Sequence, residues 1–306
     1  MNQPRKPPRR RVDGVLLLDK PAGLTSNAAL QKAKWLFNAA KAGHTGTLDP
    51  MATGLLPLCF GEATKFAAQL LTADKCYAAV LRLGVRTDTA DAEGRVLETR
   101  PVPALTQQQI EAVLARFRGR IHQVPPMHSA LKHQGRPLYD YARAGVEIER
   151  QEREVTIRSL TLRGFEADSL AFDVDCSKGT YIRVLAEDIG AALGCGAHLT
   201  ALRRTRIGSL HLAEAITPAA LEALPLDARD ALLRPVDALL AALPRLDLDE
   251  AATRRFIQGQ TVSMLTPEPS AAATARVYAA DGRFLGLGRH EAGLLAPARL
   301  VAGGAE

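Results

Sequence analysis

The sequence has little of what marks secreted, metal-binding or membrane proteins. Its 306 residues include four cysteines, Cys59, Cys76, Cys176 and Cys195, which are far apart and form no CxxC pair. This spacing predicts neither a disulfide framework nor a zinc ribbon. No apolar run approaches the roughly 20 residues that span a bilayer, and none of signal-peptide length follows the basic N-terminus. We therefore expect a cytoplasmic protein with reduced thiols and no membrane contact.

Motifs for bound phosphates and metals are also missing. The chain has no GxxxxGK[ST] loop, and residues 286–293 (GLGRHEAG) lack the third glycine of a dinucleotide-binding loop and follow no βαβ unit. His128 and His133 lie close together but have no third ligand at helix or hairpin spacing. We therefore expect no metal ion and no cofactor.

Positive charge is concentrated at the N-terminus. The formal net charge is +6, and five of these charges come from Arg5, Lys6, Arg9, Arg10 and Arg11. A proline-interrupted basic arm suits contacts with phosphates, but the same composition is typical of a solvated tail. Both interpretations of residues 1–12 stay open, and charge alone does not identify a nucleic-acid partner.

The rest of the chain has the composition and patterning of a globular α+β protein. Hydrophobic residues make up 47% and charged residues 24%, which allows a sizeable core. Strands are predicted at 14–19, 77–84, 155–165 and 169–177, and a helix capped by Ser26 at about 27–39. Thr106 and Gln109 predict a capping box before another helix, and a further helix is predicted from Ile182. Because strands and helices do not alternate regularly, an α+β fold is favoured over a βαβ fold.

Two changes in composition divide the chain. Residues 121–150 lack apolar periodicity and contain two adjacent prolines, three histidines and two tyrosines, which indicates a protruding, partner-facing segment. Residues 216–245 are rich in Ala and Leu and are broken by four prolines, which predicts short helices before a boundary near 246. After it, Asp249 is expected to cap a short helix and Asp281-Gly282 to turn a hairpin. We therefore expect a large domain at 13–245 and a small β-rich module at 246–306.

Three groups of polar residues are candidates for chemistry. Asp49 precedes Pro50 in a glycine-rich loop, a place that presents side chains from a rigid scaffold, although Asp-Pro is also common in ordinary turns. Arg183 lies in the first turn of a predicted helix, where it opposes the helix dipole, so we expect it to have a carboxylate partner. No sequence rule identifies that partner. Asp88, Asp91 and Glu93 could form an acid pair or a cation loop, but Gly94 and the neighbouring threonines favour a hydrogen-bonded surface turn.

Six segments occur in the order found in one enzyme family. They are GVLLLDKPAGLTS, AGHTGTLDPMATGLLPLCFGEATKF, KCYAAVLRLGVRTDTADAEG, PPMHSALKHQGRPLYDYARAG, CSKGTYIRVLAEDIG and GAHLTALRRTRIG. The sequence resembles the TruB family of pseudouridine synthases, bacterial enzymes that act on uridine 55 of tRNA. The resemblance is close over residues 12–215 and weaker through the C-terminal module. It implies a mixed, largely antiparallel sheet of pseudouridine-synthase type with flanking helices, a thumb-like insertion at 121–150 and a PUA-like RNA-binding domain.

The resemblance implies a cofactor-free isomerase. Asp49 matches the essential aspartate that attacks the target uridine, after which the N1 glycosidic bond breaks and the uracil rejoins through C5. Whether Asp49 adds to the sugar or assists through a glycal intermediate stays open. Tyr77 matches the tyrosine that stacks on the flipped base, and Arg183 the arginine that pairs with the aspartate.

The resemblance also implies the substrate contacts. Leu202 matches an apolar pocket residue, and His44 a histidine that fills the space vacated in the RNA loop. Lys20 and Tyr181 fall in motifs near the site. The expected partner is the T-arm stem-loop of tRNA, bound by a monomer that needs no protein partner and that also assists tRNA folding. Three cations of the insertion are expected near phosphates: Lys132, Arg136 and Arg143.

Three alternatives are weighed against this prediction. An RNA-binding module with a vestigial catalytic loop would not need Asp49, Tyr77 and Arg183 together. A glycosidase or base-excision glycosylase would also use a flipped base, but a glycosidase needs two carboxylates, and no second acid lies in the Asp49 loop. A relative that acts on ribosomal RNA is disfavoured by the C-terminal module and the insertion.

Overall fold

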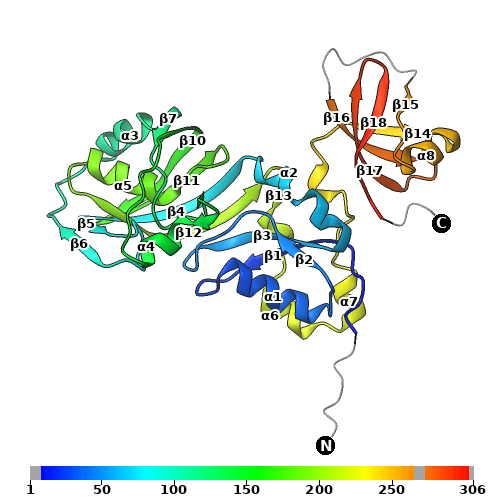
Figure 1. The fold of residues 1–306 in the computed structure, drawn as a ribbon. Helices are drawn as coiled ribbons and strands as arrows, with labels where there is room; N and C mark the ends of the chain where they lie inside the picture. The colour runs from blue at the N-terminus through cyan, green and yellow to red at the C-terminus, as the bar shows by residue number, and fades with distance from the viewer. Residues whose placement is uncertain (1–7, 265–272, 303–306) are drawn as a thin grey trace, which may run out of the picture.

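The computed structural model describes residues 8–264 and 273–302, and within them a nine-stranded sheet forms the frame of the larger domain (Figure 1). The strand order is β1-β3-β12-β4-β11-β10-β7, with β2 paired to β3 and β13 to β12. Neighbouring strands are antiparallel, apart from the parallel pair of β12 and β3. This confirms the expected mixed, largely antiparallel sheet. The strands are β1 (Gly14–Lys20), β2 (Ala42–His44), β3 (Thr53–Phe60), β4 (Lys75–Leu83), β7 (Gly119–Gln123), β10 (Arg153–Glu166), β11 (Ser169–Cys176), β12 (Ala197–Ile207) and β13 (Leu210–His211).

The side-chain pattern of each strand decides what its faces contact. In β11, Leu170, Phe172 and Val174 are buried and alternate with half-buried residues, as the sequence predicts. In β1, both faces are apolar, because Leu16 packs into the main core and Val15 into a second core on the opposite face. A continuous apolar run is therefore required of β1.

Three helices cover the main core: α1 (Ser26–Leu36), α3 (Gln107–Ala115) and α5 (Ile182–Ala192). The predicted capping box of Thr106 and Gln109 is confirmed at α3. The predicted cap of α1 is wrong: Thr25 caps the helix, and the buried Ser26 hydroxyl instead accepts from Leu48 N at 2.8 Å and donates to Leu48 O at 2.9 Å. The helix also ends at Leu36, earlier than expected.

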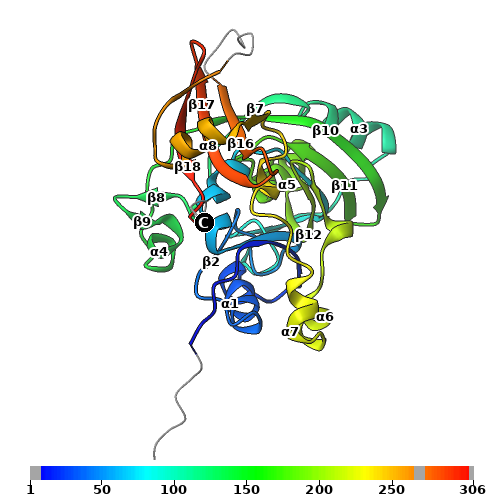
Figure 2. The ribbon, with the colours of Figure 1, turned by 90° about the vertical axis from the view of Figure 1, so that its right-hand side faces the viewer.

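Shorter elements build the periphery. The segment 124–150 projects from the rest of the larger domain and contains α4 and the hairpin of β8 and β9 (Figure 2). Residues 121–123 belong to β7, so the sheet includes the start of the predicted insertion. The prolines of 216–245 separate short helices, as predicted. These elements are β5 (Val85–Thr87), β6 (Val96–Thr99), β8 (Lys132–His133), β9 (Arg136–Pro137), α4 (Leu138–Arg143), η1 (Gly61–Phe66), α2 (Ala67–Leu71), η2 (Leu212–Glu214), α6 (Pro218–Ala223), α7 (Leu226–Asp230) and η3 (Ala238–Leu240).

The C-terminal module is β-rich, as expected, and has its own core (Figure 1). Its five-stranded sheet has the order β14-β16-β17-β18-β15. Asp249 caps α8 (Glu250–Ile257), which confirms the predicted cap. Phe66 of η1 packs against Phe284 at a centroid distance of 5.5 Å, so the module is joined to the larger domain through apolar contacts. The strands are β14 (Arg245–Leu248), β15 (Val262–Ser263), β16 (Ala273–Ala279), β17 (Phe284–Glu291) and β18 (Leu294–Leu300).

The basic N-terminal segment is only partly described. Arg5 and Lys6 lie outside the described residues. Arg10 pairs with Asp230, and Arg11 Nε lies 2.9 Å from Asp13 Oδ2, so these two cations have acidic partners within the chain. Among the helices that the structure describes, none has the length and apolar character needed to cross a membrane.

Candidate active site

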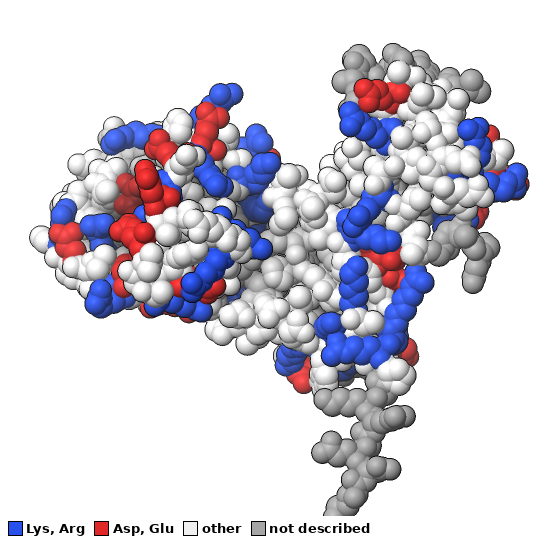
Figure 3. All heavy atoms as spheres, viewed as in Figure 1, with Lys and Arg blue, Asp and Glu red and all other residues white. Residues whose placement is uncertain are grey.

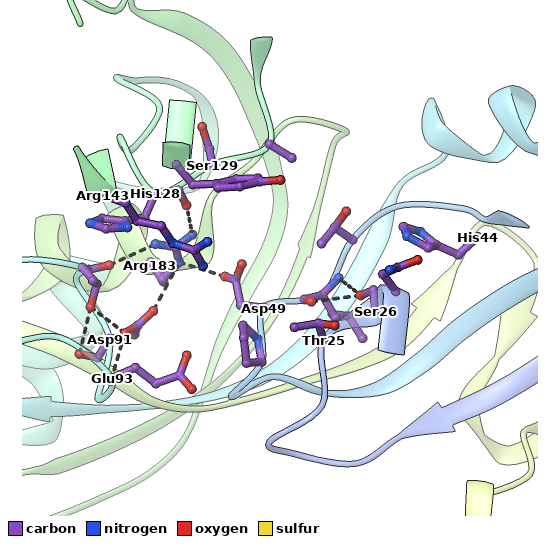
Figure 4. A pocket seen from close by; sticks show the side chains of 17 residues that line it. Thr25, Ser26, His44, Asp49, Asp91, Glu93, His128, Ser129, Arg143 and Arg183 are labelled. Carbon is purple, nitrogen blue, oxygen red and sulfur yellow. Dashed lines mark hydrogen bonds and ion pairs between the residues drawn. The ribbon is translucent and has the colours of Figure 1, made fainter. Parts of the chain in front are cut away.

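A cavity of about 550 Å³ lies between the loop that joins β2 to β3 and the projecting segment 124–150 (Figure 4). Four of the predicted site residues line it: His44, Asp49, Arg143 and Arg183. The cavity is therefore built from the glycine-rich loop, the first turn of α5 and the insertion. Its other lining residues include Asp91, Glu93, His128, Ser129 and Tyr139.

Asp49 and Arg183 form an ion pair in the middle of this cavity (Figure 4). Arg183 Nε lies 2.9 Å from Asp49 Oδ2, which confirms the predicted carboxylate partner of Arg183. The arginine side chain is 5% exposed, whereas the aspartate side chain is 37% exposed. The carboxylate can therefore meet a ligand from the cavity while the guanidinium is held behind it.

Arg183 joins three segments that are distant in sequence. Its Nη1 donates to Thr89 O at 3.0 Å and its Nη2 to His128 O at 2.7 Å. Its Nε is directed at Asp49, so the guanidinium contacts three segments: the loop that carries Asp49, the turn after β5 and the insertion. Such a fork fixes the orientation of the group that faces Asp49.

Asp91 is a site residue that the sequence reasoning missed. Its side chain is 6% exposed and its Oδ2 lies 3.6 Å from Arg183 Nε. Its Oδ1 accepts from Thr89 Oγ1 at 2.6 Å and from the backbone N–H of Glu93 at 3.0 Å. The predicted hydrogen-bonded turn is present, but its placement at the surface is wrong for Asp91, because the turn pairs with Leu199 of β12 and faces Arg183.

Lys20 is buried behind the glycine-rich loop that carries Asp49. Its Nζ donates to the carbonyl oxygens of Pro21 at 2.9 Å, Leu24 at 2.7 Å and Pro50 at 3.2 Å, and the residue has no exposed surface. Burial lowers the pKa of the ammonium to about 8, which the nearby Asp49 charge opposes. The structure thus places Lys20 where it holds the residue that follows Asp49, and not on the cavity wall.

Tyr77, Leu202 and Tyr181 surround the site without lining the cavity. Tyr77 of β4 and Leu202 of β12 are each 8% exposed. Burial raises the pKa of the Tyr77 hydroxyl, so it is protonated at neutral pH. Tyr181 precedes α5, and its backbone N–H donates to Gln123 Oε1 at 3.0 Å.

His44 lines the end of the cavity farthest from Arg183 in Figure 4. Burial lowers the pKa of its imidazole, which favours the neutral form. Its Nδ1 is buried and has no hydrogen-bond partner among the described residues. Because Nδ1 is buried, a ligand that enters the cavity can contact only the other atoms of this neutral ring.

The three predicted cations of the insertion are not equivalent. Arg143 lines the cavity, with its guanidinium carbon 5.4 Å from the centroid of the Tyr139 ring. Arg136 lies over the Tyr141 ring instead, and Lys132 is exposed on β8. Of these three, Arg143 alone therefore lines the cavity that contains Asp49.

Family models match this chain in three consecutive segments. "TruB family pseudouridylate synthase (N terminal domain)" matches residues 34–182, "tRNA pseudouridylate synthase B C-terminal domain" 183–241, and "Pseudouridine synthase II TruB, C-terminal" 244–301. A Burkholderia mallei protein named tRNA pseudouridine synthase B is 60% identical over 301 residues, which cover 97% of this chain and 99% of the relative. An Aromatoleum aromaticum protein of the same name is 60% identical over 294 residues, which cover 96% of this chain and 94% of the relative.

Solved structures share the fold. The crystal structure of a Cbf5-Nop10-Gar1 complex contains a chain with a TM-score of 0.69 and 27% identity, covering 90% of this chain and 78% of that one. A chain of the archaeal box H/ACA Nop10-Cbf5 complex has a TM-score of 0.70 and 22% identity, and the match covers 97% of this chain and 88% of that one.

Proposed function

The chain belongs to the TruB family of pseudouridylate synthases, and from this premise we propose that it converts uridine 55 in the T-loop of tRNA to pseudouridine. The names of its relatives at 60% identity support tRNA as the substrate. The observation that carries the proposal is the half-exposed Asp49 carboxylate, paired with the buried Arg183 in a cavity. The proposed enzyme acts as a monomer on the T-arm.

Asp49 is the proposed nucleophile. The N1–C1′ bond breaks, the uracil rotates, a C5–C1′ bond forms, N1 gains a proton and C5 loses one, so the RNA keeps all its heavy atoms. A nucleophilic carboxylate must be ionised, and the Arg183 guanidinium forms an ion pair with it at 2.9 Å. Asp91, whose Oδ2 lies 3.6 Å from the same Nε, adds a second negative charge beside the guanidinium and is proposed to help keep it next to Asp49.

The target base must leave its stack to reach this cavity, which costs a few kcal/mol. Tyr77 is the proposed stacking partner, and stacking on an aromatic face contributes about 1–3 kcal/mol per base. Because Tyr77 is 8% exposed and does not line the cavity, this stacking requires the cavity to open toward its ring when RNA binds. Its raised pKa supports stacking or hydrogen bonding by a neutral phenol, since a phenolate is disfavoured there. His44, at the far end of the cavity, is proposed to contact the RNA loop from which the base departs.

The cations support binding to RNA. On the face in Figure 3, Lys and Arg side chains gather around the narrow part of the molecule between the larger domain and the C-terminal module. Phosphate contacts of this kind add affinity without sequence information. Arg143, which lines the same cavity as Asp49, is proposed to hold the backbone beside the flipped nucleotide, and the PUA-like module to bind another part of the tRNA.

The test is tritium release from a T-arm stem-loop that carries 5-³H-uridine only at position 55. Wild-type protein is expected to release tritium, and Asp49→Asn to bind the RNA without release. Free uracil is measured in the same samples, because a glycosylase would release it and leave an abasic site. Binding without release by the wild type, or free uracil as the product, would contradict the proposal. A ribosomal RNA stem-loop serves as the second substrate, and preferred reaction there would overturn the assignment to tRNA.

A further inference from the structure

Arg204 of β12 is the largest side chain among those less than 2% exposed, and every hydrogen bond of its guanidinium to the main chain goes to one segment. Nε donates to Leu55 O at 2.8 Å, Nη1 to Thr47 O at 3.4 Å and Nη2 to Gly46 O at 3.2 Å. Asp49 lies between these contacts. The guanidinium therefore holds both ends of the segment 46–55, which we call the Asp49 loop.

The main chain of Arg204 contacts the same loop. Arg204 pairs with Gly54 in the parallel bridge between β12 and β3. Gly54 has φ 101°, and a Cβ at this position would lie 2.3 Å from Arg204 O. A side chain at residue 54 would therefore push the loop away from β12. Backbone and side chain of one residue thus fix where the Asp49 loop returns to the sheet.

Arg204 differs from Arg183 in its partners. In the part of the chain that the structure describes, no carboxylate oxygen lies within 4.0 Å of the Arg204 guanidinium, whereas Arg183 contacts both Asp49 and Asp91. A buried cation without an acid depends on its polar neighbours, and here these are the loop carbonyls and the Tyr77 hydroxyl. The guanidinium of Arg204 therefore keeps its hydrogen bonds only while the loop keeps this conformation.

We propose that Arg204 is a positioning residue for the isomerisation, holding both ends of the Asp49 loop so that the Asp49 carboxylate meets Arg183 and the target nucleotide. This inference rests on the proposed role of Asp49. A lysine keeps the charge but has a single nitrogen, which cannot replace a planar fork that reaches carbonyls at residues 46, 47 and 55. Misplacing a reacting group by about 1 Å costs about 100-fold in rate.

The experiment compares wild type, Arg204→Lys, Arg204→Gln, Asp49→Asn and Leu160→Ala in single-turnover tritium release over a range of protein concentrations. Leu160 of β10 is 1% exposed and far along the sheet from the loop, so its truncation controls for lost stability. Arg204→Lys is expected to lower the saturating rate about 10-fold and Arg204→Gln about 100-fold, with the half-saturating concentration unchanged. Leu160→Ala should lower the melting temperature but keep the wild-type rate at 25 °C.

Amide hydrogen exchange gives an independent readout. Residues 46–55 should exchange faster in Arg204→Lys than in wild type, and Leu160→Ala should leave them protected. The inference would be overturned if Arg204→Lys has the saturating rate of wild type. It would also be overturned if Leu160→Ala, with a melting temperature lowered as far as that of Arg204→Lys, loses as much of the saturating rate. If Arg204→Gln does not fold, the saturating rate and the hydrogen exchange of Arg204→Lys alone test the inference. Tritium release by Asp49→Asn would instead refute the proposed function, so the two failures are distinguishable.

Discussion

The two walls of the cavity are built differently. On one wall, the Asp49 loop is tied down by buried side chains, because the Ser26 hydroxyl holds Leu48 and Lys20 holds Pro50. On the other wall, Arg143 and Tyr139 are exposed and come from a six-residue helix beside two-residue strands. The residues proposed to act in the chemistry are thus held in a fixed geometry, whereas those proposed to contact RNA have exposed side chains that can adapt. We infer that substitutions on the first wall change rate and those on the second change binding.

Asp49→Asn should have the largest effect on the first wall. Loss of a nucleophile lowers the rate by on the order of 10⁴-fold or more. Folding should be retained, since the aspartate side chain is 37% exposed and Arg183 keeps Asp91 as a partner. Tritium release and thermal melting check this. A rate less than about 100-fold below that of wild type, or a variant that loses its fold, would contradict the assignment.

Asp91→Asn should lower the saturating rate about 10- to 100-fold by loosening Arg183. An asparagine oxygen can still accept from Thr89 and from the Glu93 N–H, so the free energy of unfolding should fall by only about 1 kcal/mol. The matched control is Asp88→Asn, in the same turn but 38% exposed and, among the described residues, paired only with Arg95. Equal rates for the two variants would show that Asp91 does not act through Arg183.

Arg143→Ala should act on the second wall. Loss of one phosphate contact should raise the half-saturating RNA concentration about three- to tenfold and reduce the slope of log affinity against log salt by about 0.7–0.9. The saturating rate should stay near that of wild type. Arg163→Ala on β10, 64% exposed, is the control for removal of a surface cation. Fluorescence titrations at several salt concentrations measure both quantities; an unchanged slope would remove Arg143 from the RNA contact.

Asp188→Asn should have the smallest effect and should affect stability only. Burial, followed by the neighbouring Glu187 charge, raises the pKa of Asp188 to about 6. Because the folded pKa lies above the unfolded value, wild-type stability decreases as pH rises from about 4 to about 6. The variant should gain about 1 kcal/mol at pH 7–8, after allowance for solvent screening, and nothing below about pH 4. Urea unfolding at pH 4 and pH 8 checks this, and a gain at both values would contradict the cause.

Sequence patterns predicted the fold where local rules decide it. Alternation predicted β11, and the Thr106–Gln109 pair predicted the start of α3. The cap of α1 was misassigned because Thr25 and Ser26 are both good caps, and only the contact of Ser26 with Leu48 distinguishes them.

The site was less predictable, because its contacts join distant segments. Asp49 and Arg183 are 134 residues apart, and their pairing depends on the sheet that brings them together. Asp91 carries the local signal of a surface turn and becomes buried only when that turn meets β12. Arg204 did have a signal, since alternation along β12 points it inward with Leu202 while Arg203 faces Asp19 at the surface.

The most direct test of the division between the walls is the pair of constants from single-turnover tritium release, the saturating rate and the half-saturating protein concentration, for Asp91→Asn and Arg143→Ala. The predicted result is a lower rate at unchanged half-saturation for Asp91→Asn, and the reverse for Arg143→Ala. If Asp91→Asn instead weakens RNA binding at full rate, or Arg143→Ala lowers the saturating rate, the two walls do not divide chemistry from recognition.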